Sequence, residues 1–153
     1  MFHTPIIADY FVHDDYLNEI NRDNPLGWKG RIADEFGSLV KEIWSNKYTA
    51  VAPRNFKTVL GEFQPRFSGY QQQDSSELLA FLLDALHEDT NKVLKKPATQ
   101  QVEWNGRDLS VVSKEAWDTY LLRNKSVIVD HCMGQLKSHL RCPVCNNQSI
   151  IFD

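Results

Sequence analysis

The residues best suited to chemistry stand together at the predicted start of a helix. Gln71 to Gln73 precede Asp74, and Glu77 follows three positions later, ahead of an apolar run that begins at Leu78. Long side-chain amides carry donors and acceptors, which suits the binding of an extended peptide backbone. Two carboxylates at one helix start also form a receptor for arginine, because charge-assisted forked hydrogen bonds favour a carboxylate over a neutral partner.

The two carboxylates also have a simpler structural interpretation. Asp74 with Glu77 three residues later is the acidic form of a capping box. In that arrangement the first side chain accepts from exposed N–H groups of the first turn, and the second reaches back to the N–H of the cap residue. Capping and binding are compatible because each carboxylate has two oxygens. Capping alone does not need three glutamines, so the glutamines favour an additional binding role.

Two of the three cysteines form a second candidate site. Cys142 and Cys145 have the spacing of a zinc knuckle, in which one turn between strands presents two thiolates. A structural zinc ion needs four ligands, so this pair is half a site. Three interpretations remain open: the other ligands lie beyond residue 153, Cys132 or His139 completes the site, or the pair binds no metal. His139 lies in a predicted strand three residues before Cys142, a position that can point to the other face.

Asp130, His131 and Cys132 have the residue types of a catalytic triad but not its spacing. A nucleophile and its base must approach to about 2.6–3.2 Å, with a third group that orients the base. Adjacent residues diverge on a helix or a strand, so these three cannot form that arrangement alone. We therefore expect no catalytic residue within this chain.

Apolar residues that recur every three to four positions predict the helices that position these groups. The predicted helices are about Trp28 to Asn46, a short helix beginning near Pro53, Asp74 to about Val93, and Ser113 to about Arg123. In the helix from Asp74, the predicted apolar stripe is Leu78, Phe81, Leu82, Ala85 and Leu86, and the residues expected to face away are Asp84, Glu88 and Asp89. The polar segment from Lys95 to Asp108 is predicted as a loop.

The character of the sequence changes after residue 125. Val127 to Val129 are β-branched, and Gln135 to Arg141 and Gln148 to Phe152 are predicted as strands that flank the cysteine turn. The expected fold class is α+β, with a helical part over residues 1–125 and the start of a β-rich part over residues 126–153. Both ends of the sequence break off within expected elements, which favours a segment of a larger domain.

Composition and charge exclude several classes of function. The 153 residues carry a net charge of −3 without a Lys/Arg stripe, so nucleic acid is not an expected partner. No apolar run reaches the roughly 18 residues that a membrane span needs, and the first residues do not form a secretory signal. Without an export signal, the cysteine pair favours metal binding over a disulfide, and the cytoplasm or nucleus is the expected location.

The run Gly-x-x-Gln-Gln-Asp-x-x-Glu-Leu, from Gly69 to Leu78, resembles the glutamine box of the ubiquitin-specific proteases, peptidase family C19. The resemblance covers most of the chain in the same order and spacing. Further matching segments are Thr4 to Phe11, Phe56 to Leu60 with Phe67, Trp117 to Asn124, Ser126 to Asp130, Gly134, and Cys142 to Cys145. The sequence is most similar to the subgroup with a long insertion in the catalytic domain.

This resemblance implies a papain-like cysteine protease with thumb, palm and fingers. Residues 1–125 would form the helical thumb, and residues 126–153 would form the first strands of zinc-ribbon fingers. By matching position, Asp74 and Glu77 would contact the arginine-containing tail of ubiquitin, with Gln72 and Gln73 beside that tail and the catalytic cleft. Cys142 and Cys145 would supply half the ligands of a structural zinc.

The boxes that carry the family's catalytic cysteine and histidine are absent from residues 1–153. The first hypothesis is therefore a partial catalytic domain of a cysteine-type deubiquitinase, inactive by itself, whose complete form hydrolyses bonds after the C-terminal glycine of ubiquitin. The second is a non-catalytic protein that binds ubiquitin or ubiquitinated proteins as a scaffold. The third is a zinc-ribbon interaction module, which leaves Gln71 to Glu77 unexplained. None of the three requires a catalytic cofactor.

Overall fold

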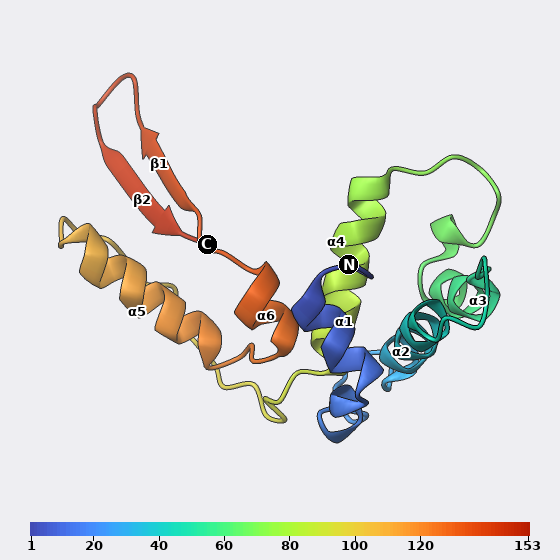
Figure 1. Cartoon of the computed structure of the whole chain (residues 1–153). Coiled ribbons are helices and arrows are strands. Elements are labelled where there is room, and N and C mark those ends of the chain that lie inside the picture. The colour runs from blue at the N-terminus through green and yellow to red at the C-terminus, as the bar shows by residue number, and fades with distance from the viewer.

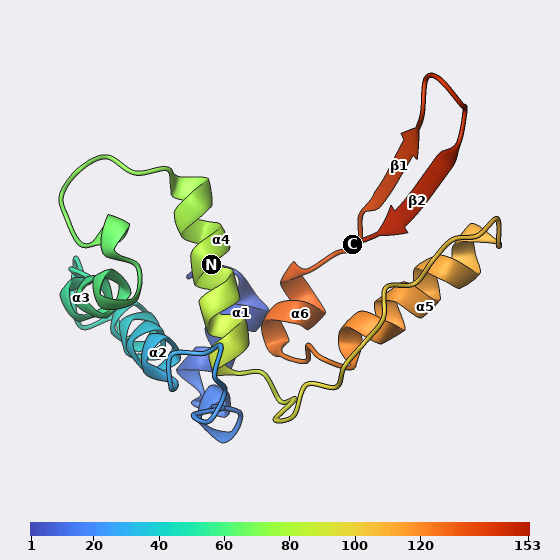
Figure 2. The same cartoon turned by 180° about the vertical axis from the view of Figure 1, so that it is seen from behind.

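A computed structural model describes all residues from Met1 to Asp153. The elements in chain order are α1 (Pro5–Val12), η1 (Asp15–Asn18), α2 (Arg31–Trp44), α3 (Arg54–Phe63), η2 (Pro65–Phe67), α4 (Ser75–Asp89), α5 (Leu109–Leu121), α6 (Val127–Cys132), β1 (Lys137–Arg141) and β2 (Gln148–Phe152). Helices α1 to α4 form one group, and α6 lies between that group and the pair formed by α5 and the β-hairpin (Figures 1 and 2). The chain is mostly helical with a C-terminal hairpin, as predicted. No helix is both long and apolar enough to cross a bilayer.

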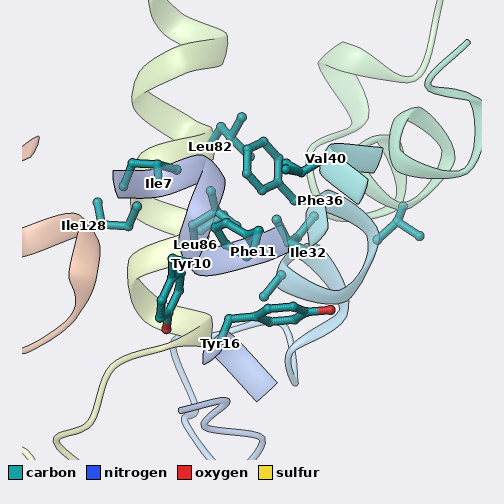
Figure 3. Packing of buried hydrophobic residues seen from close by; sticks show 13 residues of the cluster. Ile7, Tyr10, Phe11, Tyr16, Ile32, Phe36, Val40, Leu82, Leu86 and Ile128 are labelled. Atoms are coloured by element: carbon teal, nitrogen blue, oxygen red, sulfur yellow. The ribbon is translucent and has the colours of Figure 1, made fainter. Parts of the chain in front are cut away.

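The hydrophobic core lies where α1, α2 and α4 meet, and Figure 3 shows its packing. Phe11 of α1 and Phe36 of α2 are fully buried, with their rings edge to face and their centroids 4.9 Å apart. The predicted stripe of α4 reaches this core through Leu82 and Leu86. Ile128 of α6 is also fully buried in the cluster, so α6 is attached to the helical group.

The first turn of α2 is capped by a residue from another helix. Gly30 precedes α2 with a φ of 79° and offers no side chain for capping. The carboxylate of Asp89, at the end of α4, accepts instead from the backbone N–H groups of four residues. These donors are Trp28 at 2.7 Å, Gly30 at 3.1 Å, Ile32 at 3.1 Å and Ala33 at 3.2 Å. The prediction that Asp89 faces away was therefore wrong. Burial raises the pKa of Asp89, and the four donors oppose that shift because they favour the charged form.

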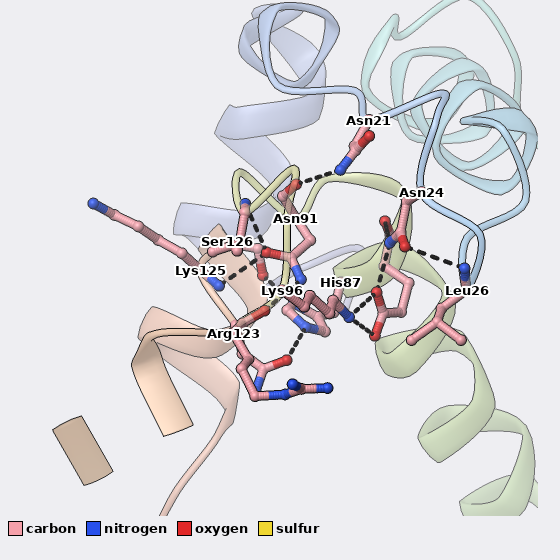
Figure 4. A network of polar contacts seen from close by, with 12 residues as sticks. Asn21, Asn24, Leu26, His87, Asn91, Lys96, Arg123, Lys125 and Ser126 are labelled. Atoms are coloured by element: carbon pink, nitrogen blue, oxygen red, sulfur yellow. Dashed lines mark hydrogen bonds and ion pairs between the residues drawn. The ribbon is translucent and has the colours of Figure 1, made fainter. Parts of the chain in front are cut away.

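Glu88 is also turned inward, against the prediction. Asn24 donates to Glu88 Oε2 at 2.6 Å, and Lys96 Nζ lies 2.7 Å from both oxygens of this carboxylate (Figure 4). Burial acts to raise the pKa of Glu88, but the hydrogen bonds from Lys96 and Asn24 outweigh it and lower the pKa below its usual value. These contacts tie the 21–30 segment and the chain after α4 to the same helix end.

The end of α4 also holds the segment that leads into α6. His87 Nδ1 lies 2.8 Å from Ser126 Oγ, and His87 Nε2 lies 3.2 Å from Asn124 Oδ1 (Figure 4). Asn91 donates to the carbonyl of Arg123 at 3.0 Å. Buried polar groups must find such partners because a lost hydrogen bond in the interior is costly. These contacts hold the segment before α6 against the helical group.

Two helices differ from the predictions, and a short polar side chain caps each of them. The first begins earlier than predicted, and the second was not predicted as a helix. α5 begins at Leu109 rather than Ser113, since Asp108 accepts from Ser110 N at 2.9 Å and from Val111 N at 3.3 Å. The β-branched residues after Ser126 form α6, although we expected the β-rich part to begin there. Ser126 Oγ accepts from Val129 N at 3.2 Å, and burial of α6 against α4 outweighs the modest β-preference of valine and isoleucine.

The predicted strands form an antiparallel hairpin. Its register runs from Lys137 opposite Phe152 to Arg141 opposite Gln148. All of β1 is exposed, whereas Ile150 of β2 is buried where the hairpin contacts α5. A lone two-stranded hairpin is marginally stable in water, so the contact with α5 supports it.

Candidate functional site

Asp74 lies at the N-cap of α4 with one carboxylate oxygen engaged and the other free. Asp74 Oδ1 accepts from Ser76 N at 2.7 Å, from Ser76 Oγ at 2.6 Å and from Glu77 N at 3.4 Å. These hydrogen bonds, led by that of the Ser76 side chain, lower the pKa of Asp74, so the group is ionised at neutral pH. Asp74 Oδ2 accepts no hydrogen bond within the chain, and the residue is exposed. The predicted cap is thus confirmed, and it leaves one charged oxygen available.

Glu77 does not complete the reciprocal capping box. Its carboxylate turns to Arg66 of η2, whose Nη1 forms an ion pair with Glu77 Oε1. Both side chains are about half exposed. Arg66 could not be predicted as a partner of Glu77, because it lies eleven residues earlier in the chain with no recognisable motif spacing. Asp74 and Glu77 are hereafter called the acidic dock.

The glutamines lie on an exposed connection between η2 and α4, which arches away from the helical group in Figure 1. Gln71, Gln72 and Gln73 are all exposed, and the backbone of residues 69–73 makes no hydrogen bond within the chain. Tyr70 before them is fully exposed at 99%, with Lys57 Nζ 3.7 Å from its ring centroid. This segment therefore presents free backbone and amide groups beside the acidic dock.

A hollow of about 640 Å³ lies next to this segment. Its lining comes from α3 and from the start of the connection, and residues 71–77 are not part of it. The lining residues are Arg54, Lys57, Thr58, Gly61, Glu62, Ser68 and Tyr70. The acidic dock itself is an open surface.

Cys142 and Cys145 lie in the turn of the hairpin, on a different element from the acidic dock (Figure 1). Cys142 N donates to Asn147 O at 2.9 Å, and Asn146 adopts a φ of 58° that closes the turn. The backbone N–H groups of Cys145 and Val144, and then the Cys145 thiol, lower the pKa of Cys142. Stabilising a thiolate in this way is what a zinc knuckle needs.

The cysteine pair fits half of a tetrahedral zinc site. No group of three or more His, Cys, Asp or Glu residues in residues 1–153 is placed to hold a metal ion. His139 Nε2 lies 2.9 Å from Gln148 Oε1 across the hairpin, and Cys132 lies at the end of α6. The interpretation in which one of these residues completes the site therefore fails, and the other two interpretations remain.

Cys132 does not have the surroundings of a nucleophile. Cys132 is exposed at the surface, but partial burial of its thiol raises the pKa, which keeps the thiol protonated at neutral pH, whereas a nucleophilic cysteine acts as a thiolate. Neither Asp130 nor His131 affects the pKa of this thiol through a hydrogen bond or its charge. The acidic dock and the cysteine turn thus remain the two candidate sites that the sequence indicated.

A mostly helical body that ends in a cysteine-bearing hairpin is consistent with part of the catalytic domain of a ubiquitin carboxyl-terminal hydrolase. The chain belongs to the ubiquitin carboxyl-terminal hydrolase family, whose model matches residues 1–153.

Two groups of relatives support the assignment. The chain is 57% identical over 150 residues to ubiquitin carboxyl-terminal hydrolase 4 of Mus musculus, a match that covers 98% of this chain and 16% of that protein. It is 53% identical over 150 residues to ubiquitin carboxyl-terminal hydrolase 15 of Xenopus tropicalis, with 98% and 15% covered. The chain therefore spans about one sixth of the length of these relatives.

Proposed function

We propose that this chain holds the ubiquitin-tail-binding segment of a cysteine-type deubiquitinase. The complete enzyme hydrolyses the bond that follows the C-terminal glycine of ubiquitin. The observation that supports this role is the acidic dock, in which Asp74 caps α4 with one oxygen and keeps Oδ2 free and charged. Asp108 caps α5 in the same way, so the features that distinguish Asp74 are its neighbours, namely Glu77, the exposed glutamines and the unpaired backbone of residues 69–73.

The neighbouring segment supports an extended ligand. An arginine of the tail binds the acidic dock, since a guanidinium pairs well with carboxylates. The tail backbone then runs along residues 69–73, whose own N–H and C=O groups are unpaired. Gln72 and Gln73 add amide donors and acceptors beside it. An extended, basic and glycine-terminated peptide matches each of these groups.

The chemical step belongs to groups outside residues 1–153. A thiolate–imidazole pair and an oxyanion hole perform acyl transfer in cysteine proteases, so the chain alone is inactive. Residues 1–125 act as the thumb and the hairpin starts the fingers, with α6 joined to the thumb by Ile128. Cys142 and Cys145 would hold one half of a structural zinc, which supplies folding stability and no chemistry.

Replacing the charges of the acidic dock tests the proposal. In the intact protein, Asp74→Asn and Glu77→Gln should each weaken ubiquitin binding in calorimetry. Asp108→Asn is the matched control, because Asp108 caps α5 through the same kind of bonds to Ser110 and Val111. If Asp74→Asn binds ubiquitin as tightly as the wild type, the acidic dock is not the tail site.

An activity assay on the intact protein distinguishes an enzyme from a non-catalytic ubiquitin-binding protein. A fluorogenic ubiquitin substrate should be turned over by the intact protein and not by residues 1–153. Ubiquitin binding without turnover in the intact protein would establish the scaffold role. Turnover by residues 1–153 that depends on Cys132 would refute the assignment of the chemistry to other segments.

A further inference from the structure

We propose that Arg66 is an intramolecular competitor for the acidic dock and lowers its affinity for an arginine-bearing peptide. This inference rests on the proposed function and concerns how the same site is regulated. Arg66 already pairs with Glu77 through Nη1 and Oε1, which is the type of contact that an incoming arginine would make.

The backbone around Arg66 is held in place. Phe67, the next residue, is buried, and its ring centroid lies 6.1 Å from that of Phe81 on α4. Ser68 Oγ donates to Pro65 O at 2.6 Å and closes the short helix η2. Because η2 is packed against the helix that carries Glu77, the guanidinium of Arg66 stays within reach of this carboxylate.

Arg66 prevents an incoming guanidinium from binding both oxygens of the Glu77 carboxylate. A guanidinium binds a carboxylate best when it engages both oxygens of one group. Asp74 Oδ1 is committed to the cap of α4, and Glu77 Oε1 is committed to Arg66. Neither carboxylate therefore has both oxygens free. Asp74 can release its oxygen only by uncapping the helix, whereas Glu77 can release its own when Arg66 moves away.

Charge acts in the same direction. Asp74 and Glu77 together carry two negative charges. The positive charge of Arg66 reduces the net charge of this group to −1. A basic tail is then attracted more weakly, and both ion pairs weaken as salt rises. Exposed ion pairs contribute about 0.2–1 kcal/mol, so Arg66 should lower the affinity for the tail by roughly 1.4- to fivefold.

The test removes Arg66 and measures monoubiquitin binding to the intact protein. Arg66→Met should tighten binding by roughly 1.4- to fivefold at low salt, with a smaller effect at high salt. Arg54→Met is the matched control, because Arg54 is an exposed cation on neighbouring α3 whose side chain forms no ion pair. A melting curve for each variant checks that the fold is unchanged.

Two further arms identify the mechanism. In a Glu77→Gln background, Arg66→Met should change the affinity no more than Arg54→Met does, because Arg66 has lost the carboxylate with which it pairs. Monoubiquitin with uncharged residues in place of its tail arginines should also bind both forms equally. Weaker binding by Arg66→Met, or a gain equal to that of Arg54→Met, would overturn the inference. If Asp74→Asn and Glu77→Gln both bind like the wild type, the proposed function fails instead.

Discussion

The carboxylate of Asp89 accepts a 2.7 Å hydrogen bond from the backbone N–H of Trp28, sixty-one residues earlier in the chain. The same side chain also receives three further N–H groups at the start of α2. A helix start needs partners for its free N–H groups, and here the end of another helix supplies them. α2 and α4 are therefore joined by hydrogen bonds as well as by their apolar faces.

Asp89→Ala should destabilise the fold by roughly 3 kcal/mol or more, because several buried N–H groups lose their acceptor at about 1–3 kcal/mol each. Urea unfolding followed by circular dichroism measures the change. Asp23→Ala is the control, since Asp23 is an exposed acid in the segment before α2 with no hydrogen bond of its own. Equal losses in the two variants would show that the cap of α2 does not depend on Asp89.

The Glu88–Lys96 pair should make stability depend on pH. The side chains are only 12% and 16% exposed, and the folded protein lowers the pKa of Glu88. Its stabilisation is therefore complete above the unfolded pKa near 4.5 and is lost as pH falls through the lower folded value. Lys96→Met should cost roughly 1.5–3 kcal/mol at pH 7, the scale of a hydrogen bond to a charged group, and less at pH 3. Unfolding free energies at both pH values measure this, and a loss independent of pH contradicts the role of the pair.

Capping and ligand binding at Asp74 can be separated. Asp74→Ala should lower stability by about 1 kcal/mol, the usual value of an N-cap, and should weaken ubiquitin binding by about 1.5–3 kcal/mol. Asp108→Ala should lower stability by a similar amount, because it removes an equivalent cap from α5, and should leave binding unchanged. Thermal melts and calorimetry on the two variants provide the comparison. Equal binding losses would mean that Asp74 acts only through the fold.

The three cysteines should differ in reactivity. In metal-free protein at pH 7, iodoacetamide should modify Cys142 faster than Cys132, because the turn lowers the pKa of Cys142 whereas burial raises that of Cys132. Mass spectrometry of digested protein measures both rates. Added zinc should protect Cys142 and Cys145 if the intact protein binds it through this turn, with Cys132 as the internal reference. Unchanged rates would show that the pair holds no zinc under those conditions.

Features that depend on residues close together in the sequence could be predicted from it. Leu82, Ala85 and Leu86 of the predicted stripe on α4 lie in the core, and the two strands around the cysteine turn are confirmed. The Asp74 cap is also confirmed, because a cap depends on residues two or three positions apart.

The incorrect predictions concern residues whose contacts come from distant parts of the chain. Asp89 and Glu88 occupy polar positions on a helix, and only the three-dimensional arrangement brings Trp28 and Lys96 to them. Val127 and its neighbours form a helix because Ser126 caps them and α4 buries them. The Arg66–Glu77 contact likewise depends on how η2 packs against α4.

The unpaired backbone between Gly69 and Gln73 also has a consequence for length variation. An extra residue there would disrupt no helix and no buried contact, so folding would not oppose it. It would, however, displace the glutamine amides relative to Asp74, which α4 keeps fixed. If the proposed tail site is correct, ligand binding rather than folding restrains the number of residues in this connection.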